Sequence, residues 1–151
     1  MNILDSDCEA IINTVNCVGV MGKGLALQFK QRYPYMFLDY KDACAAGRVE
    51  LGRIHVYEDH ATGKLIINFP TKQHWRNDSR IEYIEWGLKN LRRYLKAGGI
   101  KSIAIPPLGC GLGGLDWDDV ERLLREHLHD LPVRVMIYPP DGAPYQLKTL
   151  A

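Results

Sequence analysis

The chain has 151 residues and a mass of 17.2 kDa, a length typical of one domain that buries its own core without disulfides or metal. Hydrophobic residues make up 46% and charged residues 25%, which excludes a disordered chain. Lys and Arg (19) nearly balance Asp and Glu (18), so the net charge of +1 excludes a protein that holds nucleic acid by bulk positive charge.

Targeting and metal-binding patterns are absent from the sequence. Residues 1–7 lack the basic and apolar parts of a signal peptide, and no apolar run reaches the roughly 18 residues of a membrane span. The histidines have no metal-ligand spacing. The cysteines stand far apart, at Cys8, Cys17, Cys44 and Cys110. We therefore expect a reduced cytoplasmic protein without a metal, a cofactor or a membrane partner.

Apolar runs alternate with amphipathic stretches along the chain. This alternation predicts an α/β layered domain that occupies residues 1–151 without repeats or linkers. The expected strands are 10–15, 54–57, 65–69, 102–105 and 133–138, and the expected helices are 25–33, 35–46, 80–96 and 116–129.

The helix at 80–96 has the strongest signal, since its apolar residues form one stripe. Ser79 and Glu82 have the spacing of a capping box at its start, and Gly98 and Gly99 end it. Pro34 is expected to stop the first helix, and the chain after residue 140 reads as a polar tail.

Charge is uneven along the chain. Residues 72–101 carry eight Lys or Arg against three Asp or Glu, whereas residues 115–130 carry two against six. Both segments fit solvated helix faces. The basic segment also fits a helix that flanks an anionic ligand.

Two glycine-rich loops, 19–24 and 109–114, each join a strand to the start of a helix. Their backbone N–H groups and the following helix N-termini favour an anion such as a diphosphate. Neither matches a P-loop or a G-x-G-x-x-G fingerprint, and tight turns explain each loop taken alone.

Polar side chains near these loops have two interpretations each. Asn13 and Asn16 suit contact with a sugar hydroxyl or turn formation. In the segment 68–76, Trp75 between cations suits stacking on a nucleobase, or it plugs the core. Cys110 is either a nucleophile or, as the absence of a neighbouring histidine favours, a small packing residue.

Four motifs occur in order: Asn13-Thr-Val-Asn16, Gly19 to Gly24, Phe69-Pro-Thr-Lys-Gln-His-Trp-Arg76 and Pro107 to Trp117. Together they resemble the macrodomain family, in particular the macrodomains of DarG-type antitoxins. The resemblance covers essentially the whole chain. It implies a three-layer α/β/α sandwich with a mixed sheet that binds ADP-ribose. It also implies an ADP-ribosyl glycohydrolase that frees thymine bases of single-stranded DNA and so reverses a partner toxin, DarT.

The resemblance also assigns roles to residues. Lys72 corresponds to a catalytic lysine, and Asn16 to the asparagine that contacts the distal ribose. Tyr138 borders the adenine. Thr71, His74, Trp75 and Arg76 lie toward the DNA. The ADP-ribose loops comprise Gly22, Lys23 and Gly24, and Leu108, Gly109, Cys110, Gly111, Leu112 and Gly113.

The chain departs from the family pattern at two places. The family's first strand, which ends in Gly-Asp, is missing, so Asn2 and Ile3 stand where the adenine is read and Asn2 replaces the aspartate. Enzymes that act on ADP-ribosylated protein glutamates have an aspartate where this chain has Gly113. We therefore expect DNA rather than protein as substrate.

Lys72 is expected either to assist the departure of thymine or to attack the opened ribose as a neutral amine, since the loops offer no carboxylate pair. Three alternatives remain open: a non-catalytic ADP-ribose reader, a protein ADP-ribose hydrolase, and a module that clamps the toxin through the acidic segment. The expected partners are ADP-ribose, ADP-ribosylated single-stranded DNA and a DarT-type toxin, bound by a monomer.

Overall fold

The computed structural model describes residues 2–147, which form a six-stranded mixed sheet of order β2-β3-β1-β4-β5-β6. β1, β3, β4 and β5 run parallel, and the edge strands β2 and β6 are antiparallel to their neighbours. The strands are β1 (Ala10–Val15), β2 (His55–Glu58), β3 (Leu65–Pro70), β4 (Ser102–Ile105), β5 (Arg134–Ile137) and β6 (Tyr145–Gln146).

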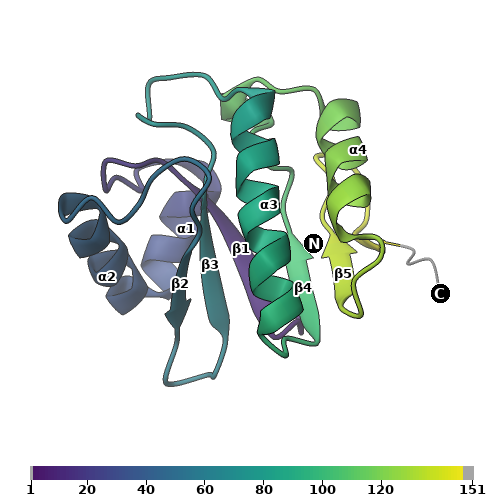
Figure 1. Cartoon of the computed structure of the whole chain (residues 1–151). Coiled ribbons are helices and arrows are strands. Elements are labelled where there is room, and N and C mark those ends of the chain that lie inside the picture. The colour runs from purple at the N-terminus through teal and green to yellow at the C-terminus, as the bar shows by residue number, and fades with distance from the viewer. Residues whose placement is uncertain (1, 148–151) are drawn as a thin grey trace.

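Four α-helices cover the two faces of the sheet. Figure 1 shows α3 and α4 in front of the sheet and α1 behind it. Each layer has its own apolar core, because both Ile11 and Ile12 of the central strand are buried but point to opposite faces. The helices are α1 (Gly24–Arg32), α2 (Pro34–Ala45), α3 (Ile81–Ala97) and α4 (Trp117–Leu128), with short 3-10 turns η1 (Ile3–Asp5) and η2 (Gly111–Gly113). The predicted α/β/α sandwich is confirmed.

Pro34 separates α1 from α2. The first helix ends at Arg32, and Pro34 is the first residue of the second, where its missing N–H costs no helical hydrogen bond. Among residues 2–147, no strand precedes β1, and η1 occupies residues 3–5 instead. Asn2 caps this turn, since its Oδ1 accepts a hydrogen bond from Leu4 N at 3.0 Å.

Two expectations about local structure are wrong. The tail contains β6, which pairs with β5 and completes the sheet edge. The capping box does not form, because Arg80 precedes α3 and makes no side-chain cap. Ser79 instead donates its backbone N–H to Gly113 O at 2.9 Å, which attaches the start of α3 to the second glycine loop.

Candidate functional site at the carboxyl edge of the sheet

The predicted site residues follow the ends of four neighbouring parallel strands. Asn16 follows β1, Lys72 follows β3, Leu108 opens the loop after β4, and Tyr138 follows β5. Because the strands are parallel, these positions meet at one edge of the sheet, the usual binding edge of α/β domains. The topology therefore brings residues from across the whole chain together.

Lys72 lies beside Asn16 because the chain segments on both sides of each residue are joined. Thr71 N donates to Val15 O at 2.9 Å, and Cys17 N donates to Gln73 O at 3.0 Å. These two bonds extend the β1–β3 pairing beyond the strands. The partly buried Lys72 donates from Nζ to Trp75 O at 3.2 Å, so its ammonium is held near the segment that leads away from the edge.

The carboxamide of Asn16 is at the centre of the first glycine loop. Its Nδ2 donates to Val20 O at 2.8 Å, and its Oδ1 accepts from Val18 N at 3.1 Å and Val20 N at 3.4 Å. Asn16 is only 6% exposed. The structure thus gives Asn16 a role in shaping the loop, in addition to the ribose contact that stays a prediction.

Tyr40 of α2 supports Asn16 from below the loop. Its hydroxyl lies 2.7 Å from the backbone oxygen of Asn16 and 2.9 Å from Oδ1. Burial, and to a lesser extent the nearby Cys44, raises the pKa of Tyr40, so the phenol stays a hydrogen-bond donor. Sequence reasoning missed Tyr40, because a residue 24 positions away leaves no spacing signal.

The exposed end of the first loop forms the N-terminus of α1. Gly22, Lys23 and Gly24 are all exposed, and Lys23 is the N-cap residue with an extended backbone and no side-chain cap. The first N–H groups of α1 are therefore free to receive an anion, to which the helix dipole adds a favourable field.

The second glycine loop is fastened by its own backbone. Cys110 N donates to Pro107 O at 3.1 Å, and Leu115 N donates to Gly109 O at 3.0 Å. The N–H groups of Gly111 and Leu112 donate to no acceptor among residues 2–147. These adjacent donors face no competing bond, which suits a second phosphate oxygen.

Gly113 lies in close contact with the side chain of Ser79. A Cβ atom at Gly113 would lie 2.6 Å from Ser79 Oγ. Ser79 Oγ is buried and has no hydrogen-bond partner in the described part of the chain. A side chain at position 113 would therefore require the Ser79 side chain to move.

Cys110 behaves as a packing residue. Its Sγ lies 3.7 Å from Leu108 O, and burial raises the pKa of the thiol to about 11. The thiol is therefore protonated at neutral pH, which opposes a role as nucleophile. Leu108 is fully buried beneath it, whereas Leu112 at the loop tip is exposed.

A cavity of about 460 Å³ lies where the adenine is expected. Asn2, Ile3 and Tyr138 line it, together with Leu25, Gln28, Pro106, Pro107, Pro139 and Gly142, and their contact with the adenine stays a prediction. Asn2 Nδ2 donates to Gln28 Oε1 at 3.2 Å. The cavity is apolar on most sides with amides at one end, a composition suited to a purine.

The predicted DNA-facing segment is a stack of three side chains. Trp75 is 43% exposed, so the interpretation as a core plug is wrong. The His74 ring lies 5.0 Å from the Trp75 ring, and the Arg76 guanidinium lies 4.6 Å from the same indole. Thr71, in contrast, is only 4% exposed, and its observed role is to hold Lys72 beside Asn16. The structure gives little support to its predicted contact with DNA.

Asn13 does not reach the edge. It is fully buried within β1, and its Nδ2 donates to Asn68 Oδ1 at 3.1 Å, so the proposed sugar contact is wrong for this residue. Asn68 in turn bonds to His55, which pairs with Asp39 at 2.9 Å.

Within residues 2–147, no cluster of three or more His, Cys, Asp or Glu side chains can hold a metal ion. No helix in that range is long and apolar enough to cross a bilayer.

A mixed sheet between two helix layers, with two glycine loops at its carboxyl edge, defines the class of protein. The sequence model of the Macro domain matches residues 12–124, and the chain belongs to this family. It is 53% identical over 147 residues to the DNA ADP-ribosyl glycohydrolase of Mycobacterium tuberculosis, which covers 93% of this chain and 41% of the relative. The corresponding protein of Thermus aquaticus is 49% identical over 142 residues and covers 92% of this chain and 39% of the relative.

Solved structures agree with this assignment. The macrodomain of Mycobacterium tuberculosis DarG superimposes with a TM-score of 0.91 at 52% identity and covers 93% of this chain and 95% of that one. Thermosipho africanus DarTG in complex with ADP-ribose gives a TM-score of 0.88 at 38% identity, over 94% of this chain and 41% of that one. The chain thus spans about two fifths of the length of the curated relatives it matches.

Proposed function

We propose that this chain binds ADP-ribose and removes it from thymine bases of single-stranded DNA, as the antitoxin activity opposed to a DarT-type toxin. The observation that carries the proposal is the pairing that holds Lys72 beside Asn16 at the carboxyl edge. The names of the relatives support the same reaction, and that of the Thermosipho africanus fusion protein joins a DNA ADP-ribosyl transferase to the glycohydrolase.

The ligand is proposed to lie along the edge in one direction. Its adenine occupies the cavity beside Asn2 and Tyr138. Its diphosphate lies between the N-terminus of α1 and the second loop, where the N–H groups of Gly111 and Leu112 are available. The distal ribose then reaches Lys72, and the DNA leaves past Trp75.

Bond cleavage passes through an oxocarbenium-like ribose as negative charge departs on the base. The loops 13–24, 71–76 and 107–114 contain no Asp or Glu, so the pair of carboxylates used by most glycosidases is not available from them. Lys72 is the cationic side chain of the joined segments 15–17 and 71–73. As an ammonium it stabilises the departing thymine, and as an amine it attacks C1″ of the opened ribose.

Replacing Lys72 tests the proposal directly. We expect Lys72→Ala to lower the release of ADP-ribose from modified single-stranded DNA by about 10²–10⁴-fold, because the side chain acts on the departing base. The affinity for free ADP-ribose, measured by calorimetry, is expected to change little. The matched control is Lys101→Ala, which removes an exposed lysine just before β4, at the end of the sheet opposite the site. Unchanged turnover in Lys72→Ala overturns the assignment.

The two routes for Lys72 are separated by trapping. When the Lys72 amine attacks C1″ of the opened ribose, the C1″–N bond to thymine breaks and the thymine leaves with a proton. The resulting imine between Lys72 and C1″ is hydrolysed by water to free ADP-ribose, or is reduced by cyanoborohydride to a stable amine. Under the covalent route, peptide mass spectrometry finds ADP-ribose on Lys72. Under leaving-group assistance it finds none, and Lys72→Arg retains partial activity because the positive charge remains.

The substrate class is tested in the same assay with ADP-ribosylated protein. Since this chain has Gly113 where enzymes that act on protein glutamates have an aspartate, we expect release from DNA and not from protein glutamates. Tight binding of ADP-ribose with release from neither substrate identifies a reader and rejects the glycohydrolase. We further propose that the chain acts as a monomer in the cytoplasm, where its free cysteines stay reduced.

A further inference from the structure

A second group of aromatic and basic side chains lies away from the carboxyl edge, along the exposed face of α3. Tyr83, Trp86, Asn90 and Arg93 follow one another at spacings of three, four and three residues, so they share one side of the helix. Arg53, just before β2, lies opposite them. We call these five residues the α3 strip.

The aromatic end of the α3 strip is exposed and ordered. Trp86 is 48% exposed, and its ring lies 5.6 Å from the ring of Tyr83. The backbone of Gly52 approaches Trp86 so closely that a Cβ there would lie 3.2 Å from the Trp86 Cβ. This contact fixes the base of the indole and leaves its outer part open, as a stacking platform requires.

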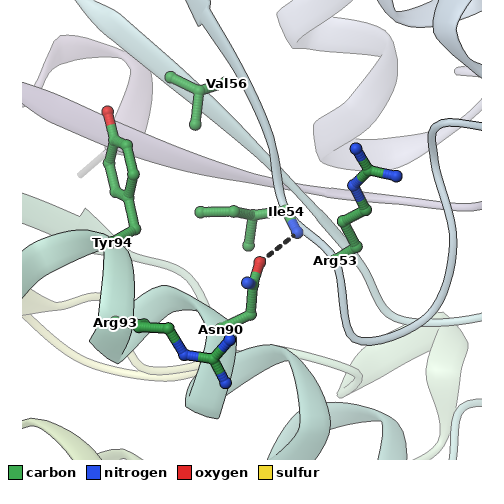
Figure 2. A pocket seen from close by; sticks show the side chains of 6 residues that line it. All are labelled: Arg53, Ile54, Val56, Asn90, Arg93 and Tyr94. Atoms are coloured by element: carbon green, nitrogen blue, oxygen red, sulfur yellow. Dashed lines mark hydrogen bonds between the residues drawn. The ribbon is translucent and has the colours of Figure 1, made fainter.

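The basic end of the α3 strip borders a cleft of about 410 Å³ between α3 and β2. Figure 2 shows Arg53 at the start of the strand and Arg93 on the helix, with Asn90 between the two elements. Asn90 Oδ1 accepts from Ile54 N at 2.8 Å, which ties the helix to the start of β2. The cleft is thus a built feature with an apolar floor of Ile54 and Val56.

The charge of this cleft is positive. Glu50 lies 3.8 Å from Arg53, an exposed pair that contributes little, while Arg93 pairs with no acidic group of residues 2–147. A cation near an exposed tryptophan and a half-buried tyrosine matches the chemistry of single-stranded nucleic acid, which offers a phosphate and a base in every unit.

The α3 strip continues from the predicted DNA-facing segment. Only six residues separate Arg76 from Tyr83, and Tyr83 to Arg93 spans about 15 Å of helix. A strand whose modified thymine lies near Lys72 and Trp75 therefore meets Trp86 and then Arg93 as it runs along α3. Contact with the phosphates of such a strand would explain the excess of positive charge in residues 72–101.

We propose that the α3 strip is a binding surface for single-stranded DNA, which holds nucleotides that flank the modified thymine. The part of the proposal that concerns modified DNA rests on the proposed function. Stacking of a base on Trp86 and contact of a phosphate with Arg93 add affinity for a longer strand without touching the ADP-ribose.

The first test uses unmodified DNA and does not depend on the glycohydrolase. A thymine-rich strand of about ten nucleotides is bound to the chain and followed by fluorescence anisotropy. We expect Trp86→Ala to weaken binding by about 5–30-fold. We expect Arg93→Ala to weaken it by about 2–5-fold and to lower the slope of log affinity against log salt by about 0.7. Tyr35→Ala and Lys101→Ala, which remove an exposed aromatic and an exposed cation elsewhere, are the matched controls.

A photo-crosslinking arm keeps the test decisive if the affinity is low. Strands carrying 5-iodouracil are irradiated with the chain, and mass spectrometry locates the linked peptide. Links to Tyr83 or Trp86 support the proposal, and links confined to other surfaces overturn it. It is also overturned if both variants bind DNA like the parent chain, or if they weaken only the binding of a DarT-type toxin.

The second test uses modified DNA. Trp86→Ala is expected to raise KM for an ADP-ribosylated strand of about ten nucleotides while kcat, and turnover of an ADP-ribosylated mononucleotide, stay unchanged. Equal KM values for the long strand in the variant and the parent chain contradict the proposal that the α3 strip binds the flanking nucleotides. Failure of the parent chain to release ADP-ribose from either substrate rejects the proposed function alone, since anisotropy and crosslinking still decide the surface.

Discussion

The two glycine loops at the carboxyl edge are stabilised in different ways. The first loop is organised around one side chain, since the Asn16 carboxamide bonds to Val18 and Val20 and is supported by Tyr40. The second loop is organised by the absence of side chains, because Gly109 and Gly113 lie in tight contact with their neighbours. Loops that share a composition and a proposed ligand therefore depend on different residues.

This difference implies different sensitivities. A loop held by a polar side chain loses hydrogen bonds when that side chain is altered. Its stability also depends on the other polar residues that bond to that side chain. A loop held by close packing around its glycines is destabilised by added atoms. Its stability does not depend on side-chain hydrogen bonds. Substitutions in each loop can separate the two cases.

The largest expected effect is in the second loop, at Gly109. Its backbone has a φ of 72°, and an added Cβ would lie 2.6 Å from Leu115 Cδ1. We expect Gly109→Ala to lower the free energy of unfolding by about 2–4 kcal/mol, through left-handed strain and overpacking together. Denaturant titration measures the loss.

The control for Gly109 lies in the same loop. Gly114 has a similar φ of 81°, but no atom lies within 4 Å of an added Cβ. Gly114→Ala is therefore expected to cost only the strain, about 1–2 kcal/mol. Equal losses in the two variants contradict the claim that close contact shapes this loop.

The next effect is in the first loop, at Asn16. We expect Asn16→Ala to cost about 1–3 kcal/mol, because the N–H groups of Val18 and Val20 and the oxygen of Val20 lose their partner. Asn16→Asp keeps an acceptor for the N–H groups of Val18 and Val20 but removes the donor to the Val20 oxygen. We therefore expect it to lose the bond to Val20 O and to keep the other two. Hydrogen exchange should rise at Val18 and not at Leu115 in the second loop. Faster exchange in both loops shows that they are coupled and contradicts the comparison.

A smaller effect is expected at Tyr40. Tyr40→Phe removes the hydroxyl that contacts Asn16 and is expected to cost about 0.5–1.5 kcal/mol. Tyr35→Phe serves as control, because Tyr35 is exposed on the same helix. If the two variants unfold at the same denaturant concentration, Tyr40 does not support the loop.

Most of the fold and the positions of both loops were predictable from the sequence. Apolar periodicity identifies β1, β3, α3 and α4 because each buries a regular set of side chains. β6 was not predictable, since two residues that pair with β5 carry no periodic signal. The capping box failed because Ser79 bonds to Gly113, a contact between distant segments that outweighed the local pattern.

The site was predictable as a set of positions and not as a set of contacts. Lys72 and Asn16 follow adjacent strands, and the resemblance of their motifs to the macrodomain family predicts that they meet. That Asn16 uses its amide within the loop, and that Asn13 points into the core, depends on Tyr40 and Asn68, which belong to other elements. Spacing along the chain contains no record of such contacts.

The smallest expected effect is a pH dependence that reaches the first loop through buried side chains. His55 Nδ1 lies 3.0 Å from Asn68 Nδ2, which only donates, so this nitrogen is an acceptor. Asn68 Oδ1 accepts from Asn13, and Asn13 Nδ2 lies 3.8 Å from the sulfur of Met21 in the loop. A second proton on His55 would place two donors face to face, at His55 Nδ1 and Asn68 Nδ2. It would therefore break this bond and disturb the contacts of Asn68 with Asn13.

Burial lowers the pKa of His55 in the folded chain, against the smaller opposing influence of Asp39. The unfolded chain binds its proton at a pKa of about 6.5, so between that value and the lower folded pKa the unfolded state carries more protons. Stability from this group is full above about pH 6.5 and falls as the pH drops, by at most about 1.4 kcal/mol per pH unit.

Unfolding free energies measured from neutral to mildly acidic pH test this dependence. His55→Gln is expected to flatten the acid-side slope, whereas His60→Gln, at an exposed position, leaves it in place. Hydrogen exchange under the same conditions should rise in the first loop before the second, since only the first has Met21 beside the network. An acid slope that persists in His55→Gln assigns the pH dependence to other groups and shows that the first loop does not depend on the protonation of His55.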